Sequence, residues 1–198
     1  MPAFATKLEP SSLYVATQTI PTADYQVFHW FLLATGADGS ATTHQWVEEN
    51  GGIGDTEEQY IRADAPTCTM NPSVIAYFRV KGYDPICADR RDSSDGNASD
   101  ESSSEGGPLS VLEQTCSSAL QHHFPTMREN RAHGLSCMTW VMSVLKKLER
   151  KGYITRPDND ITSGALEARI KSISAEQEEL LMKTLMNSKR PVAKAFSL

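Results

Sequence analysis

The sequence predicts an α+β protein in which an antiparallel sheet packs against helices. Short runs rich in β-branched and aromatic residues occupy the chain before residue 92. After residue 107, apolar residues recur at helical spacings instead. Strands followed by helices are typical of this fold class. The chain has 198 residues, and we expect it to form a single domain over 1–198.

Five segments are expected to be strands, because turn-forming Pro, Gly and Asp residues separate them. These segments are 13–19, 27–34, 41–47, 59–63 and 74–80.

Three helices are expected after residue 107. Two apolar stripes predict the first two, and they consist of Leu109, Leu112, Cys116, Ala119 and Leu120, and of Cys137, Val141, Val144, Leu145 and Leu148. Pro125 is expected to end the first helix and Gly152 the second. Ser174 to Gln177 has the pattern of a capping box, so the last helix is expected to begin there.

Residues 92–107 form an acidic segment between the two halves. The segment has five acidic residues and no Lys or Arg, so it accounts for −5 of the net charge of −6 and leaves −1 for the rest. With so few apolar residues, it is expected to be a disordered loop within the domain. It is a possible attachment point for a protein partner. The remainder has no basic stripe, so duplex nucleic acid is not an expected partner.

The distribution of apolar residues and cysteines along the sequence argues against several other classes of protein. No apolar run is long enough to span a membrane, and the N-terminus lacks the apolar core of a secretory signal, so a cytoplasmic location is expected. The four cysteines, Cys68, Cys87, Cys116 and Cys137, contain no CxxC pair, which argues against a zinc ribbon. We expect free thiols, no metal and no cofactor.

Two histidines lie on segments that are expected to form a hairpin. Residues 35–39 have the composition of a tight connection between them. If residue 33 faces residue 40, His29 lies directly opposite His44 on the same face of the sheet. A slip of one residue would turn His44 to the other face, so the arrangement depends on register.

Cys137 stands at the expected start of a helix that Ser136 can cap. The unpaired N–H groups of a helix N-terminus lower the pKa of a thiol and can bind a developing oxyanion. Such a thiol needs a histidine within reach to carry out acyl transfer, and His29 or His44 is a candidate, with His133 as another. Without such a partner, Cys137 would be a small buried residue and His29 a core histidine.

The same histidines and cysteine also carry a resemblance to a known protein family. His29-Trp30 on one strand, His44 on the next, and a helix opening with Cys137 resemble the circularly permuted papain-like fold, with the lecithin retinol acyltransferase group as the closest analogue. This resemblance implies that His29 is the base, that His44 orients it and that Cys137 is the nucleophile. The chain is also similar to uncharacterised fungal proteins that share a His-Trp strand and a Gly-x-x-Cys-x-x-Trp helix opening.

Three functional hypotheses follow. The first is cysteine-dependent acyl transfer, as a hydrolase or acyltransferase, on a small-molecule amide, ester or thioester through an acyl-Cys intermediate. The fungal resemblance implies an amide-bond-forming enzyme of secondary metabolism as an alternative. A non-catalytic binding or scaffold protein on the same fold is the other alternative.

Overall fold

The computed structural model describes residues 7–20, 27–48, 57–65, 69–71, 73–85, 110–155, 163–186 and 193–198. The acidic segment 92–107 lies outside these residues, as do Cys68 and Cys87.

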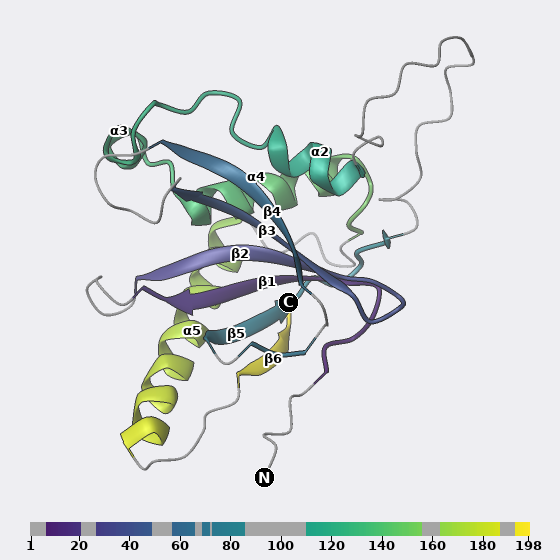
Figure 1. Cartoon of the computed structure of the whole chain (residues 1–198), viewed down its shortest axis with the longest axis vertical. Coiled ribbons are helices and arrows are strands. Elements are labelled where there is room, and N and C mark those ends of the chain that lie inside the picture. The colour runs from purple at the N-terminus through teal and green to yellow at the C-terminus, as the bar shows by residue number, and fades with distance from the viewer. Residues whose placement is uncertain are drawn as a thin grey trace.

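Six strands form one sheet in the order β4-β3-β2-β1-β5-β6 (Figure 1). They are β1 (Ser12–Thr19), β2 (Phe28–Thr35), β3 (Ala41–Glu48), β4 (Glu58–Ala65), β5 (Val74–Arg79) and β6 (Lys194–Ser197). The first five match the five expected segments closely. β6 was not predicted, and it pairs in parallel with β5, so the sheet is mostly but not wholly antiparallel.

The helices are α2 (Val111–Ser117), α3 (Met127–Ala132), α4 (Cys137–Arg150) and α5 (Ser163–Met186). The predicted end of the second helix is confirmed, because Gly152 adopts a φ of 78° just beyond α4. The predicted end of the first is wrong. α2 stops at Ser117, and Pro125 instead precedes α3, which was not predicted.

The predicted start of the last helix is also wrong. α5 begins at Ser163, and Ser174 lies inside it. Ser174 is fully buried, and its hydroxyl is 2.9 Å from the Thr17 hydroxyl of β1. This residue therefore joins the helix to the sheet and does not cap it.

Helices α2, α4 and α5 lie on one side of the sheet (Figure 1). The main core fills the space between them and the strands. Trp30, Trp46 and Trp140 are all buried in it. A second, smaller cluster, which includes Tyr14, Phe31 and Tyr77, lies on the opposite face of the sheet. None of the helices in the described ranges is long and apolar enough to cross a membrane.

Candidate functional site

Cys137 is the first residue of α4, as the sequence predicted. The Ser136 side chain accepts a hydrogen bond from the Thr139 N–H at 3.2 Å, and the Thr139 hydroxyl oxygen accepts one from the Ser136 backbone N–H at 2.7 Å. This reciprocal pair satisfies two of the N–H groups that a helix start leaves unpaired. The capped turn places the Cys137 sulfur against strand β2.

The environment of the Cys137 thiol keeps it protonated. Only 9% of the residue is exposed. The Trp30 backbone N–H donates to the sulfur at 3.4 Å, and the thiol contacts the Phe28 carbonyl oxygen at 3.9 Å. Burial raises the pKa of the Cys137 thiol, although the Trp30 N–H and the charge of Arg131 act in the opposite direction. The thiolate that a nucleophile requires is therefore disfavoured.

His29 points to the face of the sheet opposite the thiol. Side chains alternate along β2, and Phe28 and Trp30 belong to the helix-side core with Cys137. The His29 ring instead stacks on Phe31, with centroids 5.8 Å apart, and its Nε2 lies 2.9 Å from Gln45 Oε1. The sheet thus separates the His29 imidazole from the Cys137 sulfur.

The β2–β3 hairpin does not have the register that would place His29 opposite His44. Leu33 pairs with Thr43 and not with Ser40, and His44 pairs with Leu32 and not with His29. The physical reason is the length of the connection. β2 continues to Thr35, which pairs with Ala41, and the loop closes through the Gly36 N–H and the Ser40 carbonyl. An offset of three positions reverses the face, so the two histidines lie on opposite sides of the sheet.

His44 lies on the helix side and is almost fully buried, at 1% exposed. Its Nδ1 is 2.7 Å from the Tyr60 hydroxyl and its Nε2 is 3.1 Å from the Thr42 hydroxyl. Burial lowers the pKa of His44 to about 4, so the imidazole is neutral at neutral pH. Both ring nitrogens are engaged with hydroxyl groups rather than with the thiol.

Within the described ranges, neither His133 nor Cys116 is a partner for Cys137. His133 stacks on Phe124 with ring centroids 4.0 Å apart. Cys116 is fully buried in the core, and burial raises its pKa. Among the described residues, no group of three His, Cys, Asp or Glu side chains is arranged to hold a metal ion. The structure therefore does not bring Cys137, His29 and His44 together.

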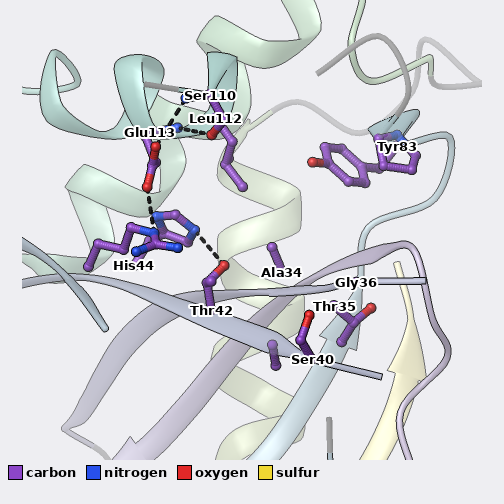
Figure 2. A pocket seen from close by; sticks show the side chains of 13 residues that line it. Ala34, Thr35, Gly36, Ser40, Thr42, His44, Tyr83, Ser110, Leu112 and Glu113 are labelled. Carbon is purple, nitrogen blue, oxygen red and sulfur yellow. Dashed lines mark hydrogen bonds and ion pairs between the residues drawn. The ribbon is translucent and has the colours of Figure 1, made fainter. Parts of the chain in front are cut away.

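A cavity of about 240 Å³ lies beside His44 instead. Its wall combines the end of the β2–β3 hairpin, one residue of β4, the start of α2 and the turn after β5 (Figure 2). Ser40, Thr42 and Tyr83, which carry hydroxyl groups, are among its lining residues, together with the charged Arg62 and Glu113. We call this space the His44 cavity.

The two charged side chains of the His44 cavity neutralise each other. Arg62 Nε donates to Glu113 Oε1 at 2.5 Å, and the Glu113 side chain is only 15% exposed. The other oxygen, Oε2, accepts the Ser110 N–H at 3.0 Å as part of the capping box of α2. Arg62 also pairs with the exposed Asp64, at 2.8 Å. The guanidinium and carboxylate are thus fixed in position before any ligand arrives.

Sequence reasoning found His44 but missed its neighbours in the cavity. Ser110 and Glu113 have the spacing of a capping box, which was a readable signal for the start of α2 and for an acidic residue there. Arg62 gave no comparable signal, because a charged residue on an edge strand is normally solvated. Only the folded sheet places it against Glu113.

Comparison of the chain with family models, with curated proteins and with solved structures finds no match.

Proposed function

We propose that the protein is a non-catalytic binding protein and that the His44 cavity holds its ligand. The observation that carries this proposal is the set of polar groups around the cavity, which are already fixed by hydrogen bonds to one another. Prearranged polar groups lower the cost of ordering a site when a ligand binds. The hypothesis needs no contact between Cys137 and a histidine.

The chemistry of the lining favours a compact, uncharged, hydroxyl-rich ligand such as a sugar or polyol. Arg62 and Glu113 balance each other, and His44 is neutral at neutral pH, so neither sign of charge is in excess on the wall. Hydroxyl groups both donate and accept hydrogen bonds, and therefore match a wall of hydroxyls, a guanidinium and a carboxylate. At about 240 Å³ the cavity is smaller than typical drug-sized sites, which start at roughly 300 Å³.

We expect ribose, used as a probe, to bind in this cavity and to shift the NMR signals of Thr42 and His44. Thr42→Val keeps the shape of the side chain but removes the hydroxyl that meets both His44 Nε2 and the cavity. This variant should weaken the affinity for ribose about tenfold, a loss typical of a buried polar group left unpaired.

Thr43→Val is the matched control, because residue 43 is the next on β3 and faces the other side of the sheet. It should leave the affinity for ribose unchanged. Equal weakening by both variants, or signals around the cavity that do not move as ribose is added, would contradict the proposal.

Acyl transfer through Cys137 stays the competing hypothesis, and alkylation of the thiol distinguishes the two. We expect iodoacetamide to modify Cys137 about a hundredfold more slowly in the native protein than in denaturant, because the sulfur is buried and held as a thiol. The rate should still be rising at pH 9, because burial raises the pKa of the Cys137 thiol above its ordinary value. Peptide mapping by mass spectrometry across pH 5 to 9 would measure this.

His29→Ala is the informative variant for that experiment. Since His29 lies across the sheet from the sulfur, its removal should not change the pH midpoint of Cys137 labelling. Fast labelling with a midpoint below about 7.5 that moves in His29→Ala would establish a thiol–imidazole pair and overturn the binding proposal.

A further inference from the structure

A second and larger cavity lies on the face of the sheet opposite the helices. Its volume is about 440 Å³, within the range of small-molecule sites. Its apolar wall includes Phe31 and Leu33 of β2 and Val74 at the start of β5. All three are buried members of the smaller hydrophobic cluster. We call this space the Gln45 cavity, after the β3 residue that lines it.

Three amide residues line the Gln45 cavity, namely Gln18, Gln45 and Asn71, and the last two have their side-chain oxygens engaged by the protein. Gln45 Oε1 is bound to His29 Nε2 at 2.9 Å. Asn71 Oδ1 accepts from the backbone N–H of Ser73 at 2.9 Å and from the Ser73 hydroxyl at 2.8 Å. A backbone N–H can only donate, so this contact fixes the orientation of the Asn71 amide.

With the oxygens engaged, the NH2 groups are the ends of these amides that are left for other partners. The Gln45 NH2 group makes a long bond of 3.5 Å to the Thr43 hydroxyl. Such a distance is at the weak limit of a hydrogen bond. The cavity therefore offers N–H donors to a ligand, and a carbonyl oxygen is the natural complement.

The wall of the Gln45 cavity carries no formal charge. Its described lining residues include no Asp, Glu, Lys or Arg. Burial raises the pKa of the Tyr77 hydroxyl, so this group stays protonated at neutral pH. Burial likewise lowers the pKa of His29 behind Gln45, which favours a neutral ring. A charged ligand would lose its hydration here without gaining a counter-charge.

We propose that the Gln45 cavity is a binding site for an uncharged, largely apolar molecule that carries a carbonyl oxygen, with the Gln45 and Asn71 amides as donors to that oxygen. The site is independent of the His44 cavity, because the two lie on opposite faces of β3. His29 is then a positioning residue, since its ring holds Gln45 by the oxygen and leaves the NH2 group for the ligand.

Acetophenone and benzoate are suitable probes, because they have similar size and shape but differ in charge. We expect acetophenone to bind at millimolar concentration and to shift the side-chain NH2 signals of Gln45 and Asn71 in proton–nitrogen NMR spectra. Benzoate should bind at least about tenfold more weakly. Ethylbenzene, which has the ring but no carbonyl group, should leave the two NH2 signals in place.

Two substitutions at residue 45 test the donor. Gln45→Leu removes the amide, and Gln45→Glu keeps its shape and can still accept from His29 but presents no NH2 group. Both should weaken acetophenone binding about tenfold. Gln59→Leu is the matched control, because Gln59 is an exposed glutamine on β4 outside the cavity, and it should have no effect.

The outcomes separate this site from the proposed ribose site. Acetophenone binding that Gln45→Leu and Gln45→Glu both leave unchanged would overturn the inference. So would equal binding of benzoate, or the absence of any shift at Gln45 and Asn71. Ribose binding should be the same in Gln45→Glu as in the unaltered protein. A negative result for acetophenone at the Gln45 cavity can therefore be distinguished from a negative result for ribose at the His44 cavity.

Discussion

Replacing Arg131 with methionine is expected to lower the free energy of unfolding by about 3 to 5 kcal/mol. Arg131 of α3 binds the carboxylate of Glu58 at the start of β4 with two hydrogen bonds, of 2.6 and 3.1 Å. The Glu58 side chain is only 2% exposed, and its second oxygen also accepts from Asn130 at 2.9 Å. Without the guanidinium, a carboxylate is left buried and uncompensated.

Urea denaturation followed by circular dichroism would measure this loss. The Arg131→Met/Glu58→Gln double variant should regain much of the stability, because the neutral amide no longer needs a cation. Lys171→Met is the matched control. Its ion pair with Glu167 on α5 is largely exposed, so its loss should cost less than about 1 kcal/mol. Equal costs for Arg131→Met and Lys171→Met would show that burial of Glu58 does not set the size of the effect.

Gly82→Ala is expected to lower the free energy of unfolding by about 3 kcal/mol. Gly82 adopts a φ of 69° just after β5, a conformation that favours glycine. A Cβ atom there would lie 1.8 Å from the carbonyl oxygen of Thr155, which is backbone and cannot rotate away. The Thr155 N–H also donates a hydrogen bond to the Gly82 carbonyl oxygen. Moving the two segments apart to relieve the clash would therefore break this hydrogen bond.

Gly152→Ala separates the cost of the backbone conformation from the cost of the clash. Gly152 has a similar φ of 78°, but no atom lies within 4 Å of its added Cβ. This control should cost only about 1 kcal/mol. Thermal and urea unfolding of the two variants would measure the difference, and equal losses would mean that the Thr155 contact is not rigid.

The fold class was predictable because it depends on local patterns. The strands β1 to β5 have compositions that suit a half-buried or fully buried sheet, and α4 has an apolar stripe and a Ser136 cap that are visible in a short window. The start of α5 was not predictable in this way. A serine before an acidic residue is a good capping signal, but Thr17 on a distant strand binds the Ser174 hydroxyl inside the helix.

The short elements escaped prediction for related reasons. β6 spans Lys194–Ser197, too few residues for a periodic pattern, and it forms because β5 has a free edge for it to join. α3 is held in place by Asn130 and Arg131, whose buried partner, Glu58, is far away in the sequence. No local pattern could have identified that pairing.

The sequence by itself determined that five strands precede the helices and that Cys137 begins a capped helix. Each of these depends on neighbours within a few positions. Only the tertiary structure decided which side of the sheet each histidine faces. Side chains alternate at every residue of a strand, so the loop that sets the register of β2 and β3 also sets whether the two histidines share a face of the sheet. That register places His44 beside a polar cavity and His29 behind Gln45, on opposite faces of one sheet.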